Sequence, residues 1–207
     1  MHDGNFTAFL IDDDPAILKA LSRLLRASGY GVMPFHSSRA FLAAHDSSIP
    51  GCAIVDLAMP DIDGLQLQEA LHRENVERPM IFLTGNGDIP TSVRAMKAGA
   101  IDFLTKPVRQ SHLLAALTRA IEADAQMRQE RASLQSINDR LSLLTRRESE
   151  VLRYVVAGRL NKQIAGSLGT VEKTIKVHRG RMMTKLGVRC VADLVRLAER
   201  AGITPQA

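Results

Sequence analysis

The first half of the sequence alternates short apolar runs with helix-forming segments, and this alternation constrains the fold more than any other feature. The apolar runs lie at residues 7–11, 31–35, 52–56, 80–84 and 101–105. Helical spacing of apolar residues marks the segments between and after them, at about 15–29, 38–45, 64–74, 88–98 and from 110 onward. Such alternation is typical of a parallel sheet covered on both faces. It predicts an α/β domain with a five-stranded, doubly wound parallel sheet, the flavodoxin-like arrangement.

The last third of the chain predicts only helices. Thr145 and Glu148, in TRRE, stand at the spacing of a capping box, in which two side chains satisfy the start of a helix. A glycine follows each helical segment, and we expect these segments at 146–157, 162–168 with Asn161 as its cap, 171–186 and 191–201. Helices this short are not stable alone, so we expect them to pack together as an all-α domain.

A long helix is expected to join the two parts. Residues 111–144 contain neither Gly nor Pro, so the last helix of the first domain should continue as a linker. At alternating intervals of four and three residues along this helix, the residues are apolar at both ends, but Asp124, Arg131 and Asn138 occupy such positions in the middle. This pattern favours a solvated spacer helix over a continuous dimeric coiled coil.

Charge is divided unevenly between the two parts. Residues 1–125 carry 11 Lys and Arg against 15 Asp and Glu, a net charge of −4, whereas residues 126–207 carry 16 against 7, a net charge of +9. A basic C-terminal part suits a polyanion such as nucleic acid. No apolar run approaches the roughly 18 residues of a membrane helix. We therefore expect a cytoplasmic protein with no membrane partner.

The two cysteines offer no site of their own. Cys52 and Cys190 are too few and too far apart in the sequence for a disulfide framework or a zinc site. We expect both to be small buried apolar side chains.

Polar side chains follow several of the predicted strands. Ligands of a parallel sheet bind beyond the carboxyl ends of its strands. The residues expected there are Asp12, Asp13, Asp14, Asp56, Thr84 and Lys106. Clustered carboxylates favour a hard cation such as Mg²⁺, while Asp14 is expected to be a helix cap. With a lysine and a hydroxyl nearby, such a site suits phosphoryl transfer to a carboxylate, with Asp56 as the nucleophile.

The motifs IDDD, VDLAMPDIDG, LTG and TKP, in this order and at these separations, resemble the receiver domain of bacterial two-component response regulators. The resemblance implies that Asp56 accepts a phosphoryl group from a sensor histidine kinase. Asp12, Asp13, Asp56 and the backbone carbonyl of Ala58 would bind Mg²⁺. Thr84 and Lys106 would contact the phosphoryl group, Phe103 would be a switch aromatic, and the Lys106–Pro107 bond would be cis.

The basic segment that begins LTRRESEV and ends TKLGV, residues 144–188, resembles a LuxR-type helix-turn-helix. With the receiver in front, the whole chain resembles the NarL/FixJ family, and LTGNGDIPTSVRAMKAGAIDFLTKP favours its FixJ branch. Lys176, Val177 and Gly180 would then face base edges, and Lys173, Thr174, Arg179 and Arg181 would mainly hold phosphates. Two departures stand out. Val171 occupies a position where the family often has a Ser or Thr cap, and Gly180 has no side chain to read a base.

These resemblances imply a receiver at 1–122, a helical linker at 123–142 and a DNA-binding domain at 143–207. We expect a DNA-binding transcription factor whose dimerisation and DNA affinity depend on phosphorylation of Asp56. Its partners would be the kinase, an inverted repeat in double-stranded DNA, a second copy of the chain and RNA polymerase. It would not be an enzyme, apart from catalysing its own phosphorylation and dephosphorylation. The alternatives are a phosphorylation-independent DNA-binding regulator and a Mg²⁺-dependent phosphatase acting through Asp56.

Overall fold

The computed structural model describes residues 6–74, 76–85 and 89–206. The chain forms two compact units, residues 1–128 and residues 129–207. Among the described residues, none of the helices combines the length and the apolar character that a bilayer span requires.

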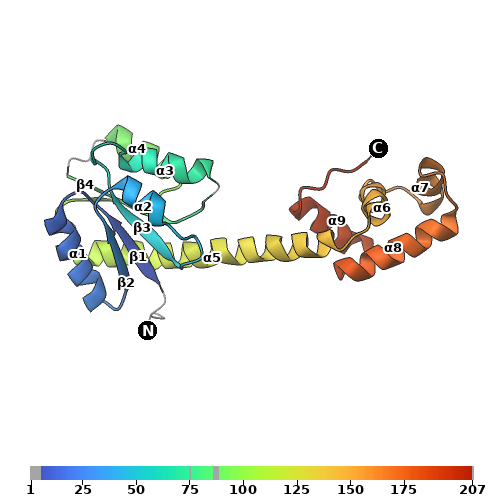
Figure 1. The fold of residues 1–207 in the computed structure, drawn as a ribbon, viewed down its shortest axis with the longest axis horizontal. Coiled ribbons are helices and arrows are strands. Elements are labelled where there is room, and N and C mark those ends of the chain that lie inside the picture. The colour runs from blue at the N-terminus through green and yellow to red at the C-terminus, as the bar shows by residue number, and fades with distance from the viewer. Residues whose placement is uncertain (1–5, 75, 86–88, 207) are drawn as a thin grey trace. The chain divides into compact units, whose positions relative to one another are not determined.

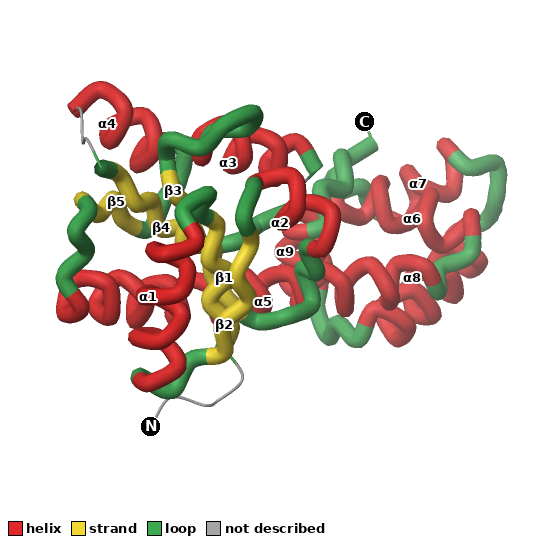
Figure 2. The backbone as a smooth tube through the Cα atoms, turned by 60° about the vertical axis from the view of Figure 1, so that its left-hand side comes forward, coloured by secondary structure: helices red, strands yellow, loops and turns green. Residues whose placement is uncertain are grey.

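The N-terminal unit is the predicted five-stranded parallel sheet (Figure 1). Its strands are β1 (Thr7–Ile11), β2 (Gly31–Phe35), β3 (Gly51–Asp56), β4 (Met80–Thr84) and β5 (Asp102–Thr105), in the order β2-β1-β3-β4-β5. One face is covered by α1 (Pro15–Ala27) and α5 (Gln110–Ser142). The other is covered by α2 (Ser38–Ala44), α3 (Gly64–Arg73) and α4 (Ile89–Lys97) (Figure 2). Position 88, where the fourth helix was predicted to begin, lies outside the described residues.

The strands alternate their side chains between two cores. Leu10, Ile54 and Ile81 are register partners across β1, β3 and β4, and all three are buried on the face of α1 and α5. Val55, Phe82 and Phe103 are partners on the opposite face, under α2, α3 and α4. Burial of each such side chain stabilises the fold by about 1.5–3 kcal/mol. The strands are therefore fixed in register on both faces, and so are the residues that follow them.

The predicted ends of α1 are confirmed. The backbone N–H of Ala16 donates to Asp14 Oδ1 at 2.8 Å, so Asp14 caps the helix and Pro15 begins it. Gly29 follows the helix with φ of +89°, a left-handed conformation that glycine adopts without steric cost.

α5 is one helix of 33 residues, as the absence of Gly and Pro predicted. It is not solvated along its whole middle, however. Asp124 is buried in the N-terminal unit, and Ile137 is 3% exposed in the core of the C-terminal unit. The prediction of a solvated spacer is wrong at these residues, because each packs on a neighbouring element that the spacing within one helix does not reveal.

The C-terminal unit packs the end of α5 with α6 (Arg146–Val156), α7 (Asn161–Ser167), α8 (Glu172–Leu186) and α9 (Val191–Arg200). Its core includes Val151, Leu152, Ile164, Ile175, Met182, Leu186 and Leu194. The capping box at the start of α6 is confirmed: Thr145 N–H donates to Glu148 Oε2 at 2.9 Å, and Glu148 N–H donates to Thr145 Oγ1 at 3.3 Å.

Two expectations about the C-terminal unit are wrong. Asn161 is the first residue of α7 rather than its cap, because Asn161 Oδ1 accepts a hydrogen bond from Arg179 of α8 at 3.0 Å. Cys190 is exposed rather than buried, because it stands at the start of α9, whereas Cys52 is buried in β3. Val171 precedes α8 and provides no side-chain cap.

A neutral histidine lies at the amino edge of the sheet. Arg78 Nε donates to His45 Nε2 at 2.8 Å, so this imidazole nitrogen must carry no proton. The ring also packs edge-on against Phe41, with centroids 5.1 Å apart. Burial, and then the charge of Arg78, lower the pKa of His45 below its ordinary value of 6.5.

Acid is therefore expected to destabilise the N-terminal unit through His45. A group whose pKa is lowered by folding contributes stability above its unfolded pKa, and this contribution is lost as pH falls through the folded value. The free energy of unfolding should decline below about pH 6.5. In His45→Gln, whose amide oxygen can still accept from Arg78, the decline should be smaller. Urea denaturation followed by circular dichroism from about pH 7.5 to about pH 5 measures both.

The matched control is His72→Gln, since His72 is an exposed residue of α3. This variant should keep the pH dependence of the wild type. Equal slopes in His45→Gln and the wild type would contradict the role given to His45.

Candidate functional site

Three aspartates meet at the carboxyl edge of the sheet. Asp12 follows β1 and Asp56 ends β3, and they are neighbours because Ile11 pairs with Val55. One carboxylate oxygen from each of Asp12, Asp13 and Asp56 lies within 4.8 Å of the other two. Asp12 and Asp56 are buried, whereas Asp13 is exposed. The edge therefore presents one accessible and two buried carboxylates.

Lys106 is placed between the two buried carboxylates. Its Nζ lies 2.6 Å from Asp12 Oδ2 and 2.6 Å from Asp56 Oδ1. The remaining oxygens accept from the backbone: Asp14 N–H donates to Asp12 Oδ1 at 2.9 Å, and Ala58 N–H donates to Asp56 Oδ2 at 3.2 Å. The Lys106–Pro107 peptide bond is cis. Both carboxylates are thus held in fixed orientations.

The local charges shift two pKa values in this cluster. Burial raises the pKa of Asp12, and the neighbouring Asp56 adds to this, while the Lys106 ammonium opposes it. Burial alone would lower the pKa of Lys106, but hydrogen bonds to Asp12 and Asp56 raise it above the ordinary value. The two carboxylates therefore favour the charged form of Lys106 at this edge.

Thr84 and Phe103 lie on β4 and β5, the two strands that follow β3 across the sheet. Thr84 ends β4, is 2% exposed, and accepts from the backbone N–H of Lys106 through its carbonyl at 2.7 Å. Phe103 lies in β5, is half-buried and packs into the core under α2, α3 and α4. Thr84, the Lys106 ammonium and three carboxylates thus lie at the carboxyl edge that the sequence predicted.

This arrangement suits a divalent cation and an anionic group together. Carboxylate and carbonyl oxygens are the ligands that Mg²⁺ prefers, and it commonly takes only one or two protein carboxylates. Asp13, which is exposed, and the buried pair offer such oxygens on one side of the cluster. Lys106 brings a positive charge that can pair with added phosphoryl oxygens.

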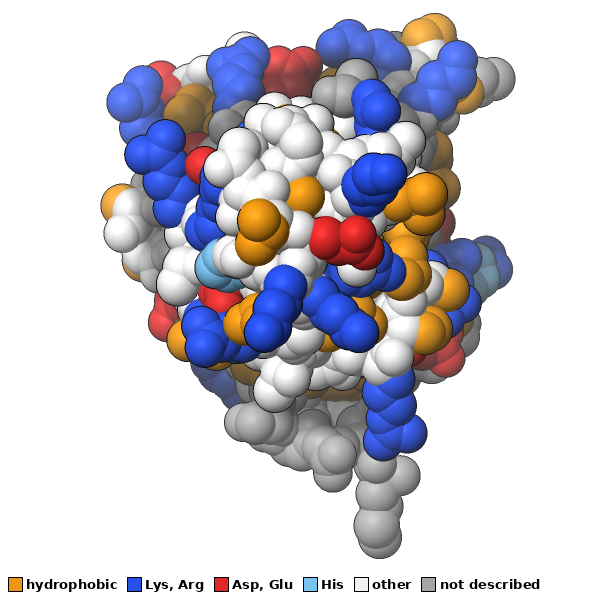
Figure 3. Space-filling model, turned by 90° about the vertical axis from the view of Figure 1, so that its right-hand side faces the viewer, with side chains coloured by type: hydrophobic (Ala, Val, Ile, Leu, Met, Phe, Trp, Pro, Cys, Tyr) orange, Lys and Arg blue, Asp and Glu red, His pale blue; other side chains and the backbone are white. Residues whose placement is uncertain are grey.

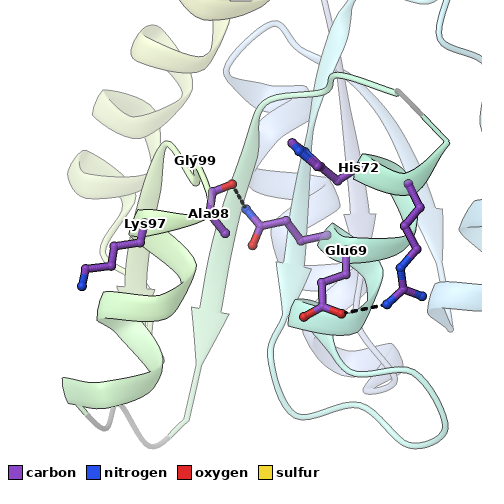
Figure 4. Close-up of a pocket in the computed structure, with 7 residues that line it drawn as sticks. Glu69, His72, Lys97, Ala98 and Gly99 are labelled. Carbon is purple, nitrogen blue, oxygen red and sulfur yellow. Dashed lines mark hydrogen bonds and ion pairs between the residues drawn. The ribbon is translucent and has the colours of Figure 1, made fainter.

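α4 buries few of its described side chains in the N-terminal unit. Among residues 90–97, only Ala95 is buried, while Val93 and Met96 are 44% and 46% exposed. A hollow of about 600 Å³ lies between α3 and the end of α4 (Figure 4). Gln68 of α3 crosses it and donates from Nε2 to the carbonyl of Ala98 at 3.0 Å. Sequence analysis did not single out Gln68, because only the folded chain brings it to Ala98.

α8 carries an exposed basic face. Lys173, Lys176, Val177, Gly180 and Arg181 are exposed, while Thr174 and Arg179 are half-buried. Nothing lies within 4 Å of the position of a side chain at Gly180. Figure 3 views the end of the C-terminal unit, and Lys and Arg side chains occur at many points of the face that it shows.

Lys185 of α8 does not belong to that basic face. Its Nζ pairs with Glu148 Oε2 at 2.6 Å, and Glu148 is 2% exposed. Burial by itself would raise the pKa of Glu148, but hydrogen bonds from Lys185 and Thr145 hold it below its ordinary value. Lys185 therefore joins α8 to the start of α6.

Two family models match the chain, one for each unit. Residues 8–118 match the response regulator receiver domain. Residues 142–198 match the bacterial regulatory proteins of the luxR family.

Curated relatives and solved structures resemble the chain over nearly all of its length. The response regulator protein TodT of Pseudomonas putida is 42% identical over 200 residues, which cover 97% of this chain and 88% of TodT. The transcriptional regulatory protein FixJ of Bradyrhizobium diazoefficiens is 38% identical, over 94% of this chain and 95% of FixJ. The structure of the response regulator StyR is 42% identical, with a TM-score of 0.78 over 95% of this chain and 99% of StyR.

Glu148 is expected to stabilise the C-terminal unit more than a charged residue in the first turn of a helix usually does. Glu148→Ala removes half of a capping box and leaves Lys185 without its partner. The expected loss is about 2–3 kcal/mol in the free energy of unfolding. Glu150→Ala is the matched control, since Glu150 pairs with Arg147 at the surface of the same helix, and its loss should stay below about 1 kcal/mol. Equal losses in urea denaturation would contradict a structural role for the Lys185–Glu148 pair.

Proposed function

Because the chain belongs to the two-component response regulators that join a receiver domain to a LuxR-type DNA-binding domain, we propose that phosphorylation of Asp56 controls its binding to DNA. The observation that supports this most directly is Lys106 Nζ at 2.6 Å from both Asp12 and Asp56. A sensor histidine kinase in the cytoplasm supplies the phosphoryl group. An oxygen of Asp56 attacks phosphorus, the bond to the kinase histidine breaks, and Asp56 becomes an acyl phosphate.

Asp12, Asp13 and Asp56, with the backbone carbonyl of Ala58, would bind Mg²⁺ in this proposal. The bound ion would neutralise negative charge on the phosphoryl oxygens. Lys106 holds Asp56 in place before transfer, and pairs with the phosphoryl group afterwards. Support for this ligand set comes from the three carboxylate oxygens within 4.8 Å of one another.

Thr84 and Phe103 would carry the change away from Asp56. The Thr84 hydroxyl moves toward the phosphoryl oxygens, and Phe103 turns further into the space beside β4. α4 follows at little cost, because Ala95 is its one buried residue among positions 90–97. The altered face of α4 and β5 then pairs with its copy in a second chain, which shifts an existing equilibrium toward a dimer.

The dimer places two copies of α8 on an inverted repeat in double-stranded DNA. Lys176 and Val177 face base edges, with Gly180 at a third, open position. Lys173, Thr174, Arg179 and Arg181 contact phosphates, which fix register without reading sequence. α9 adds to the contact between the DNA-binding units, and RNA polymerase is the next partner at the promoter. The functional division in this proposal is 1–122, 123–142 and 143–207.

Asp56→Asn is expected to abolish phosphorylation, because the amide is a poor nucleophile. Incubation with acetyl phosphate and Mg²⁺, followed by intact-mass spectrometry, should add one phosphoryl group to the wild type and none to the variant. Chelation of Mg²⁺ should prevent labelling of the wild type. Asp63→Asn is the control, since Asp63 caps α3 through the backbone N–H of Gln66, and it should be labelled normally. Labelling of Asp56→Asn at the wild-type rate would refute the acceptor assignment.

Lys176→Ala is expected to relax base preference, because Lys176 is exposed on the face of α8 that is proposed to enter the major groove. The preference for a selected duplex over random DNA should fall by about 1–3 kcal/mol. Lys185→Ala removes the same charge from the same helix, but Lys185 pairs with Glu148, so it should lower stability and leave base preference unchanged. Fluorescence anisotropy with both duplexes, with and without acetyl phosphate, measures this. Equal affinity in both phosphorylation states would favour a phosphorylation-independent regulator.

A further inference from the structure

A second group of buried charges lies at the amino edge of the sheet, opposite the aspartates. Arg78 is 8% exposed, and its guanidinium carbon lies 4.3 Å from the centroid of the Phe9 ring. Its Nη2 donates to the carbonyls of Asp46 at 2.9 Å and Ile49 at 3.2 Å. Burial lowers the pKa of Arg78 to about 10, against the opposing charge of Asp124. Arg78 thus fixes the loop between α2 and β3 through two backbone carbonyls at the amino edge of the sheet.

Arg128 of α5 binds the same loop. Its Nη1 donates to the carbonyl of Ser48 at 2.9 Å, and its Nη2 to the carbonyl of Ser47 at 3.2 Å. Its Nε donates to Asp124 Oδ2 at 2.8 Å, and Asp124 is 6% exposed. Two arginines therefore satisfy four consecutive backbone carbonyls, those of residues 46–49. We call Arg78, Asp124, Arg128 and residues 46–49 the exit clamp.

The exit clamp lies where α5 leaves the N-terminal unit. Arg128 is the last residue of that unit, and α5 continues to Ser142 in the C-terminal unit. Any signal that passes along the chain between the units must pass through this helix. Two of the three hydrogen bonds of this planar guanidinium reach the loop, at Ser47 and Ser48, and the third, to Asp124 on the same helix, fixes the orientation of the guanidinium.

Two strands connect the exit clamp with the carboxyl edge. β3 starts directly after the loop, at Gly51, and ends at Asp56. β4 starts two residues after Arg78 and ends at Thr84. These strands are hydrogen-bonded neighbours, and each spans about 17–20 Å. Movement of Thr84 or Asp56 along a strand axis would therefore displace the loop that Arg128 binds.

We propose that Arg128 is a positioning residue that transmits the phosphorylated state of Asp56 to α5. This inference rests on the proposed function, in which phosphorylation controls DNA binding. Its chemistry is confined to the amino edge of the sheet, so its loss leaves the acceptor site intact.

The test compares Arg128→Ala with Arg73→Ala. Both arginines pair with a carboxylate four residues earlier on their own helix, Arg73 with Glu69 at 3.2 Å and Arg128 with Asp124 at 2.8 Å. Only the hydrogen bonds of Arg128 to Ser47 and Ser48 reach a second element. Arg128→Lys keeps the charge and can reach one carbonyl, so it tests whether the several donors of the planar guanidinium are needed.

The full-length chain would be incubated with acetyl phosphate and Mg²⁺, and labelling measured by intact mass. The DNA probe is a duplex selected from a random pool by the phosphorylated wild type, with dissociation constants from fluorescence anisotropy. The readout is the ratio of the dissociation constants without and with phosphorylation. In Arg128→Ala this ratio should be smaller than in the wild type by about threefold or more, while labelling is unchanged. Arg73→Ala should match the wild type, and Arg128→Lys should lie between.

The outcomes separate the two proposals. A wild-type ratio of one would overturn the proposed function. A wild-type ratio above one that persists in Arg128→Ala would overturn the role of Arg128 alone. Loss of labelling in Arg128→Ala would also overturn it, because the residue would then act on the acceptor site or on folding instead of on transmission.

Discussion

Three carboxylates held together at one edge of a sheet repel one another, and the fold must supply a compensating charge. Two unit charges about 4 Å apart interact by about 4 kcal/mol at the effective dielectric of a protein surface. Lys106 supplies this charge, at 2.6 Å from both Asp12 and Asp56. The strand order matters for this contact, because Lys106 follows β5, which lies two strands from β3. Pairing of β3, β4 and β5 is therefore needed for the lysine to reach the aspartates.

The carboxyl edge was predictable because its residues are set by strand ends. The apolar runs bound the strands to within one residue, and parallel strands bring their carboxyl ends to the same edge. Asp12 and Asp56 then follow from the pairing of Ile11 with Val55. The cap at Asp14 and the capping box at Thr145 were predictable for a similar reason, since each depends on neighbours within three residues along the chain.

Residues whose partners lie far along the chain were not predictable in this way. Lys185 lies on a helix with many cations, but its partner Glu148 is 37 residues earlier. Asn161 looked like a cap, but it accepts from Arg179 across the helix pair. The exit clamp joins Arg128 to a loop 80 residues earlier. A single sequence carries the periodicity of each element, but not which faces meet.

The N-terminal unit combines one weakly held helix with one strongly held helix, and this difference decides where motion can occur. α4 buries only Ala95 among residues 90–97, so burial of side chains at these positions contributes little to holding it in place. α5 buries Leu113, Ala116, Leu117 and Ala120 in the sheet core and is then fixed again at Arg128. In the proposed function, a change at Asp56 would therefore move α4 locally without unfolding the unit. In the proposed transmission, α5 would carry a change only by shifting together with the strands and the loop to which it is bound.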